Sequence, residues 1–206
     1  MTVLMAIRYQ YNKISLQNLA KQLKIRTQAL PILKNKESAL RIEVKNAKKV
    51  AEEYLKEIYV ILEKYKEGAR LWSEFDPTLL GIKNIDIKYT KIAGITIPEF
   101  EAISFTVKDF SLYDNPNWFP DGIRILKELY TVLVKKDLAL RKMEMLNYAR
   151  KKTTQKVNLY EKVQIPGYEE AIRKIKSFLE DEENLLKSAQ KIIKSRQEIG
   201  ETSNIE

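Results

Sequence analysis

The residue types that most often carry out chemistry in proteins are missing from this sequence. Its 206 residues include no histidine and no cysteine. Histidine is the commonest general base near neutral pH, and histidine and cysteine are the usual zinc ligands. Nucleophilic catalysis by a Ser/His or Cys/His pair is therefore excluded, and we expect no catalytic residue, no metal site and no bound cofactor.

The glycines and the clustered carboxylates also fit poorly with a ligand site. Consecutive carboxylates on a helix, such as the run "EDEEN" that begins at Glu180, point in different directions and do not converge on one cation. We interpret this run as a solvated helix face. A phosphate-binding loop needs closely spaced glycines, whereas the six glycines lie far apart, at Gly68, Gly81, Gly94, Gly122, Gly167 and Gly200.

Positive charge is concentrated in the two ends of the chain. Lys and Arg outnumber Asp and Glu by 14 to 6 in residues 1–66 and by 18 to 13 in residues 123–206, whereas acidic residues prevail by 9 to 5 in residues 67–122. Basic surfaces of this kind bind acidic partners. The candidate basic surface near the N-terminus comprises Lys21, Lys24, Arg26, Lys34, Lys36 and Arg41.

Nucleic acid is one possible acidic partner, because arrays of Lys and Arg release counterions from its phosphates. No nucleic-acid reader motif and no row of stacking aromatic residues accompanies the basic residues. We therefore expect no direct binding to nucleic acid. A basic coiled-coil hairpin that binds nucleic acid or acts as a scaffold is the alternative function.

The apolar residues at both ends of the chain follow the period of a coiled coil. From Leu16 to Tyr65 they advance by alternating steps of three and four, and the same spacing runs from Ile165 to Arg196. A period of 3.5 residues keeps one stripe of each helix facing a partner helix. The predicted coiled-coil core consists of Leu16, Leu19, Leu23, Leu30, Leu33, Leu40, Val44, Ile58, Ile61, Ile165, Ile172, Ile175, Leu179, Leu186 and Ile193.

The middle of the chain has the pattern of a β-hairpin. From Ile85 onward, β-branched and aromatic residues alternate with polar ones, and a second β-branched run follows a short break. This pattern predicts two strands over about residues 85–107, joined by a turn at Ala93 and Gly94. Pro98 marks either an edge strand or the end of a strand.

These patterns predict a mainly α fold in three segments. Residues 1–66 form an N-terminal helix, residues 67–122 form a middle region with the β-hairpin, and residues 123–206 form a C-terminal helix. We expect the two helical segments to pack as a long antiparallel coiled coil, because this arrangement buries both apolar stripes within one chain. A parallel dimer of each stripe is the alternative.

The C-terminal stripe contains two adjacent helix breakers, Pro166 and Gly167. Proline removes one backbone hydrogen bond, and its ring collides with the carbonyl four residues earlier. Because the apolar spacing continues beyond this pair, we expect a kink at Pro166 and Gly167 and not the end of the helix.

Three segments of the sequence resemble the D subunit of the V-type and A-type rotary ATPases. Residues 155–183, "QKVNLYEKVQIPGYEEAIRKIKSFLEDEE", are similar to the C-terminal signature of that family, and "KIAGITIPEFE" at residues 91–101 is similar to its hairpin segment. The N-terminal "LQNLAKQLKIRTQALPILKNKESAL" at residues 16–40 is a weaker match. The segments occur in the family's order, and Pro31 and Gly167 depart from its pattern, as in a divergent bacterial member.

The resemblance implies that the chain is the non-catalytic axle of a central stalk. It would transmit torque between ATP hydrolysis or synthesis in the head and ion translocation in the membrane ring. The implied partners are the catalytic and regulatory head subunits, which would face the basic surface, together with the F subunit and the socket subunit on the membrane ring. Because no segment looks like a signal peptide or a membrane span, we expect a cytoplasmic chain that is peripheral to the membrane.

Overall fold

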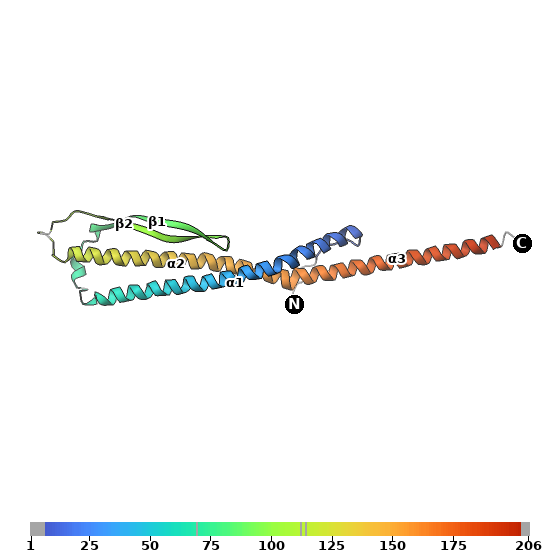
Figure 1. The fold of residues 1–206 in the computed structure, drawn as a ribbon, viewed down its shortest axis with the longest axis horizontal. Helices are drawn as coiled ribbons and strands as arrows, with labels where there is room; N and C mark the ends of the chain where they lie inside the picture. The colour runs from blue at the N-terminus through green and yellow to red at the C-terminus, as the bar shows by residue number, and fades with distance from the viewer. Residues whose placement is uncertain (1–6, 69, 112, 114, 203–206) are drawn as a thin grey trace. The chain divides into compact units, whose positions relative to one another are not determined.

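The computed structural model describes residues 7–68, 70–111, 113 and 115–202 (Figure 1). The predicted mainly α fold, with long helices toward both ends and an antiparallel β-hairpin between them, is confirmed. The main elements of this part of the chain are α1 (Lys13–Lys64), β1 (Leu80–Ile92), β2 (Ile95–Val107), α2 (Phe119–Leu159) and α3 (Ile165–Thr202). A π-helix, η4 (Tyr160–Gln164), joins α2 to α3, and the short 3-10 helices η1 (Lys66–Gly68), η2 (Leu71–Glu74) and η3 (Pro77–Leu79) precede β1.

Helix α1 begins where the sequence supplies a cap. The backbone N–H of Ser15 donates a hydrogen bond to Asn12 Oδ1 at 2.6 Å. Such a bond satisfies one of the backbone donors that have no partner in the first turn of a helix. Pro31 lies inside α1 on an exposed position, and the helix continues past it to Lys64.

The chain forms two compact units. The first unit comprises residues 1–35 and 154–206, and it contains the beginning of α1, the end of α2, η4 and α3. The second unit comprises residues 36–153, and it contains the rest of α1, the β-hairpin and most of α2. Helices α1 and α2 therefore each contribute to both units.

In the second unit the β-hairpin packs on helices α1 and α2, and Figure 1 shows it running alongside α2. Ile97 of β2 is fully buried and forms one cluster with Leu40 of α1 and Leu146 of α2. Ile92 and Ile95, which flank the turn of the hairpin, pack against the same cluster. Burial of apolar side chains from three elements at one place fixes the hairpin on the helix pair.

Polar and aromatic contacts also hold β2 against α2. Lys142 Nζ lies 3.1 Å from Glu99 Oε1, and both side chains are partly buried. Earlier on α2, the Lys135 ammonium lies 5.3 Å from the ring centre of Phe100. A cation over an aromatic face is attracted by the electrons of the ring. The docked strand is thus attached to α2 by charged side chains as well as by its buried isoleucine.

The hairpin turn consists of Ala93 and Gly94. Ile92 pairs with Ile95, so these two residues form the whole loop. Both have positive φ, 51° for Ala93 and 80° for Gly94, which is the geometry of a type I′ turn. Strand β1 begins at Leu80, earlier than the predicted start of the hairpin at residue 85.

Pro98 lies inside β2, opposite Tyr89, and does not end the strand. Each strand of a two-stranded sheet has an edge without a neighbouring strand, and such edges accommodate proline. Pro98 is predicted to mark either an edge strand or the end of a strand, and it lies in an edge strand.

Aromatic side chains pack around the start of α2. The ring centres of Trp72 and Trp118 are 5.2 Å apart, and those of Phe75 and Phe119 are also 5.2 Å apart. A Cβ added to Gly122 would lie 2.7 Å from the Trp118 ring, so only glycine fits there. Phe119 is buried in this cluster, and α2 begins at this residue, four residues before the predicted segment boundary at residue 123.

In the first unit helices α1 and α3 pack in opposite directions. Leu19 of α1 packs in one cluster with Ile175 of α3. Farther along α1, Lys34 forms an ion pair with Glu161 of η4. The partner residue number falls as the α1 residue number rises, which is the pattern of an antiparallel pair.

Candidate functional site

The residues of the predicted coiled-coil core differ in burial. Four are buried, most are half-buried and two are exposed. A narrow seam between two helices leaves the edges of its side chains in water, so half-burial is expected for a coiled coil. The buried residues are Leu19, Leu40, Ile61 and Ile175; the half-buried ones are Leu16, Leu23, Leu30, Leu33, Val44, Ile58, Ile165, Ile172 and Leu179; the exposed ones are Leu186 and Ile193.

The placement of Leu186 and Ile193 corrects the predicted extent of the core. Their side chains are 59% and 57% exposed, and every described α3 side chain from residue 180 to 196 is exposed. Leu179 still packs in the cluster of the first unit. Helix α1 begins at Lys13 and therefore does not extend along this part of α3. Within the described chain the seam ends near Leu179.

The six residues of the predicted basic surface lie in different surroundings. Lys21, Lys24, Arg26 and Lys34 belong to the first unit, whereas Lys36 and Arg41 belong to the second. Lys21 and Lys24 are exposed, and Lys36 lies near the hairpin turn, with its Nζ 3.8 Å from the position of a Cβ on Gly94.

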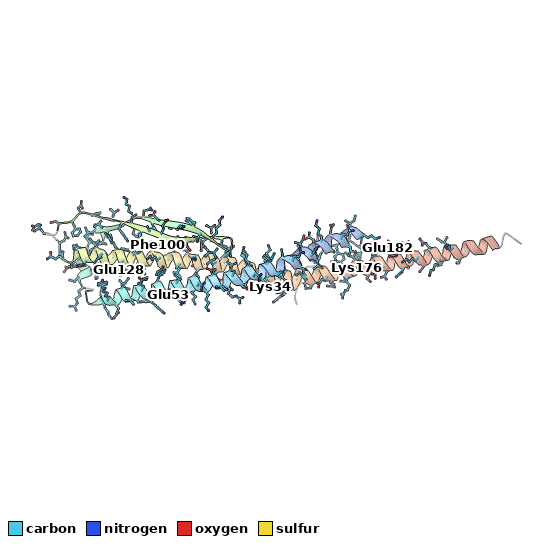
Figure 2. All side chains as sticks on the ribbon, in the orientation of Figure 1. Lys34, Glu53, Phe100, Glu128, Lys176 and Glu182 are labelled. Carbon is cyan, nitrogen blue, oxygen red and sulfur yellow. The ribbon has the colours of Figure 1, made fainter. Side chains whose placement is uncertain are left out.

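Three of the six basic side chains bind partners within the chain. Lys34 Nζ lies 2.6 Å from Glu161 Oε1, and an Arg41 nitrogen lies 2.9 Å from Glu37 Oε1. Arg26 is half-buried in the seam. The exposed charged side chains labelled in Figure 2 include Glu53, Lys176 and Glu182.

Arg26 makes several polar and aromatic contacts in the first unit. Its Nε donates a hydrogen bond to Gln164 Oε1 at 2.6 Å. Its guanidinium carbon lies 4.7 Å from the ring centre of Tyr168 and 5.8 Å from that of Tyr160. A planar guanidinium stacks on aromatic rings while it donates hydrogen bonds in its own plane. Arg26 therefore binds side chains from η4 and α3 together.

The chain passes through Pro166 and Gly167 without leaving the helix. Both residues lie in the first turn of α3, directly after the π-helix η4. A Cβ added to Gly167 would lie 3.0 Å from Ile7 Cδ1, so a larger residue would press on the N-terminal segment. The predicted continuation of the helix is observed, while the kink at Pro166 and Gly167 stays a prediction.

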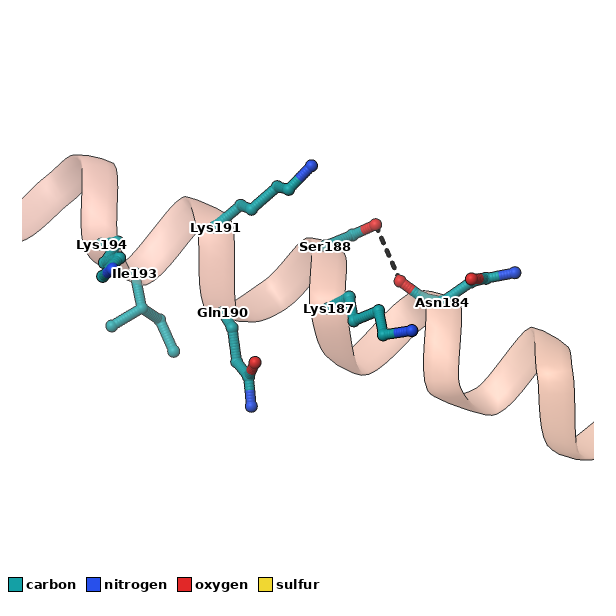
Figure 3. A pocket seen from close by; sticks show the side chains of 7 residues that line it. All are labelled: Asn184, Lys187, Ser188, Gln190, Lys191, Ile193 and Lys194. Atoms are coloured by element: carbon teal, nitrogen blue, oxygen red, sulfur yellow. Dashed lines mark hydrogen bonds between the residues drawn. The ribbon is translucent and has the colours of Figure 1, made fainter.

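No enclosed ligand site is formed by the described side chains along the outer part of α3. A hollow of about 820 Å³ is lined by seven residues of this one helix, from Asn184 to Lys194 (Figure 3). Figure 3 shows that these side chains leave the helix in different directions, and that Ser188 Oγ donates to the Asn184 carbonyl at 2.9 Å. Ligand pockets enclose most of their ligand, whereas this hollow is bounded on one side only, by a single helix.

The shifted pKa values have local causes on helix surfaces. Hydrogen bonds from the backbone N–H and the hydroxyl of Thr78 lower the pKa of Asp76, which caps η3. On α3 a hydrogen bond between Lys174 and Glu170 lowers the pKa of Glu170 and raises the pKa of Lys174. Caps and pairs one turn apart are ordinary features of helices.

The described residues offer neither a metal-ligand cluster nor a membrane span. Their Asp and Glu side chains form no group of three or more that could hold a metal ion. None of the helices in the described ranges combines the length and the apolar character needed to cross a membrane.

Two features of the first unit are absent from the sequence-based predictions. The π-helix at Tyr160–Gln164 has no compositional signature, although Pro166 marks its neighbourhood. Arg26 is predicted to belong to a basic surface, yet its position within the apolar period of α1 signals a residue of the seam. A charged residue at a seam position is a signal that periodicity does contain.

Comparison with known proteins shows to which family the chain belongs. The family described as the D subunit of ATP synthase matches residues 15–195. The chain belongs to this family. Its members are stalk subunits of rotary ATPases, so the fold seen here is that of a stalk subunit that assembles with other ATPase subunits.

Individual members of the family are similar over most of their length. The V-type ATP synthase D subunit of Borreliella burgdorferi is 30% identical over 188 residues, which cover 89% of this chain and 93% of the relative. Those of Chlamydia abortus and Chlamydia pneumoniae are 29% and 30% identical over 183 residues, covering 84% and 86% of this chain and 87% of each relative. This D subunit is thus a divergent member that retains nearly the full length of its relatives.

Proposed function

We propose that this chain is the axle of the central stalk of a V-type or A-type rotary ATPase. It transmits torque between ATP hydrolysis or synthesis in the catalytic head and ion translocation in the membrane ring, and it catalyses no step itself. The observation that carries the proposal is the family match over residues 15–195, which includes parts of both units and the hairpin. Long paired helices suit this task because their backbone hydrogen bonds lie along the axis and resist bending.

The first unit is the part that we assign to the catalytic and regulatory head subunits. Lys21, Lys24 and Lys34 are the exposed members of the basic surface there, and Lys34 is paired with Glu161. Lys24 also borders a groove of about 600 Å³ between α1 and α3, whose floor includes Leu16, Leu23 and Ile172. Exposed charges attract an acidic partner over several ångströms without demanding one fixed geometry. Such contacts suit a partner surface that must pass the axle repeatedly.

The second unit is the part that we assign to the F subunit and to the socket subunit on the membrane ring. It contains the acidic middle region, whose charge is opposite to that of the chain ends. With its head-facing and socket-facing parts bound to other subunits, the chain is held peripheral to the membrane through the complex.

A reversible crosslink between the chain and the head tests this function. The chain has no cysteine, so Lys21→Cys introduces a single attachment point for a photoreactive crosslinker that contains a cleavable disulfide. The assembled ATPase carrying this variant is irradiated, and ATP hydrolysis and ion transport are measured before and after addition of a reductant.

A rotating axle requires that crosslinking stops both activities in proportion to the crosslinked fraction, and that the reductant restores both. The labelled complex without irradiation is the matched control. Full ion transport by complexes whose chain is crosslinked to the head would rule out rotation of this chain against the head.

A further inference from the structure

The buried stripe of the C-terminal helical segment changes phase by one residue over the stretch from Tyr160 to Lys174, which contains the π-helix. In α2 the stripe advances by alternating steps of four and three through Ala139, Met143, Leu146, Arg150, Thr153 and Val157, all of which are buried or half-buried. The same steps continue through Tyr160, Gln164, Gly167 and Ala171, which are half-buried or buried, and then reach Lys174 and Phe178, which are exposed. The seam of α3 instead contains Ile175 and Leu179, each one residue later.

The π-helix supplies the extra residue that this change of phase requires. The backbone N–H of Ile165 donates to the carbonyl of Tyr160, five residues earlier, where an α-helix would bond four residues back. A single π turn inside an α-helix is equivalent to an insertion of one residue. One residue corresponds to about 100° of rotation about the helix axis. The insertion therefore decides which side chains of α3 face α1.

Proline explains why the wide turn is tolerated at this place. Pro166 has no N–H, so a regular α-helix would lose one bond there, and the proline ring would collide with the carbonyl of Lys162. A wider turn immediately before the proline relieves this collision. Proline alone does not choose the residue at which the extra turn begins, because an adjacent turn would also relieve the collision.

Two cationic side chains of α1 contact the π-helix directly. Arg26 Nε donates to Gln164 Oε1 at 2.6 Å, at the last residue of η4. Lys34 Nζ lies 2.6 Å from Glu161 Oε1, near its first residue. The Arg26 guanidinium also lies against Tyr160 and Tyr168, at the start of the insertion and just beyond its end. The contacts thus cover the whole length of the wide turn.

We propose that Arg26 is a positioning residue that holds the one-residue insertion at Tyr160–Gln164 and thereby fixes which face of α3 packs on α1. Polar residues at single seam positions of coiled coils specify the arrangement at some cost in stability. Leucine would fit the apolar period at this position, as it does at Leu23 and Leu30. Arg26 therefore contributes more to the choice of conformation than to the free energy of unfolding. This inference concerns the folded chain alone and does not rest on the proposed function.

Hydrogen exchange measured by mass spectrometry on the isolated full chain tests the proposal. The variants are Arg26→Leu, Gln164→Leu and the double variant, with Lys21→Leu as the matched control on the exposed face of the same helix. Loss of a hydrogen bond to a charged group corresponds to about tenfold or more in a local opening equilibrium. We expect each single variant to accelerate exchange of the amides in residues 160–168 by about tenfold.

The double variant distinguishes a shared contact from two independent effects. If Arg26 and Gln164 act through their mutual bond, the double variant exchanges no faster than the faster single variant. We also expect Arg26→Leu to unfold at a denaturant concentration no lower than that of the wild type. Should Arg26→Leu not fold, the same cycle is run with Arg26→Lys, which keeps the charge but loses the planar group and the Nε donor.

Three results would overturn the proposal. They are unchanged exchange in residues 160–168 when Arg26 is replaced, an acceleration in Lys21→Leu equal to that in Arg26→Leu, or single-variant effects that multiply in the double variant. None of these results would bear on whether the chain turns inside the ATPase, which the crosslinking experiment decides separately.

Discussion

At the scale of single residues, Ala93 occupies a backbone conformation that L-amino acids other than asparagine and aspartate rarely adopt. Its φ is 51°, and among the described residues it is the one non-glycine residue with positive φ. The type I′ turn requires this conformation at both central positions, and Gly94 supplies the second without strain. The hairpin therefore forms in spite of Ala93.

A pair of identical substitutions measures this strain. Ala93→Gly relieves the unfavourable φ but adds flexibility to the unfolded chain, so we expect almost no change in the free energy of unfolding. Ala102→Gly, at an exposed position of β2 with ordinary φ, gains no relief and should destabilise by about 0.5–1 kcal/mol. Urea titrations of both variants compare them, and equal destabilisation by the two changes would refute the strain.

At the scale of elements, the β-hairpin buries the side chain of Ile97 fully against the helices. Ile97 is fully buried between Leu40 of α1 and Leu146 of α2. The neighbouring Thr96 is exposed on the same strand. Because the side chains of a strand alternate between faces, this contrast shows which face of β2 is docked.

Truncation of that isoleucine should loosen the hairpin. Ile97→Ala removes buried apolar atoms and leaves a cavity, which typically costs about 2–5 kcal/mol of the free energy of unfolding. Thr96→Ala is the matched control and should change it by less than about 0.5 kcal/mol. Denaturant unfolding followed by tryptophan fluorescence and by circular dichroism gives both values; a cost for Ile97→Ala as small as that of the control contradicts the docking role.

The elements show how far periodicity predicts the fold and where it stops. The 3.5-residue repeat locates the seam because each step places an apolar residue on the same side of the helix. Leu186 and Ile193 obey the same repeat but are exposed, because a repeat on one helix does not tell how far its partner extends. The turn at Ala93 and Gly94 is predictable because strand patterns end on both sides of it.

Apolar periodicity does not predict the π-helix, for a physical reason. A change of phase by one residue resembles ordinary scatter in an apolar pattern, because Ala171 in the α2 phase is buried and Ile172 in the later phase is half-buried. The distinction rests on Lys174 and Ile175, whose burial is decided by packing against α1 and not by their types alone. Arg26 gives the clearest local signal, since a charge within a seam needs a partner.

At the scale of the whole molecule, the two units share two continuous helical segments. Helix α1 contributes to both units, and α2 continues through η4 into α3. Each unit has its own buried cluster, around Leu40 and Ile97 in the second and around Leu19 and Ile175 in the first. The proposed transmission of torque needs such covalent and hydrogen-bonded continuity, because torque applied at one unit would have to reach the other along its helices.

The pairing of the helices determines which of the predicted basic residues bind within the chain and which are accessible to another subunit. Of the predicted basic residues in the first unit, Lys21 and Lys24 are exposed, Lys34 is exposed but paired with Glu161, and Arg26 is half-buried and bonded to Gln164. Composition counts these charges but does not separate those that bind within the chain from those accessible to another subunit. The distinction needs the antiparallel pairing of α1 with η4 and α3.

Single-molecule observation of the ATPase head complex tests the central claim most directly. The head is immobilised through its catalytic subunits, and a gold nanorod is attached to the chain through Tyr113→Cys, a fully exposed position of the second unit. We predict that the nanorod turns persistently in one direction while ATP is hydrolysed and stops when ATP is removed. Continued ATP hydrolysis with a nanorod that shows only random angular motion would contradict the claim that this D subunit is the rotating axle.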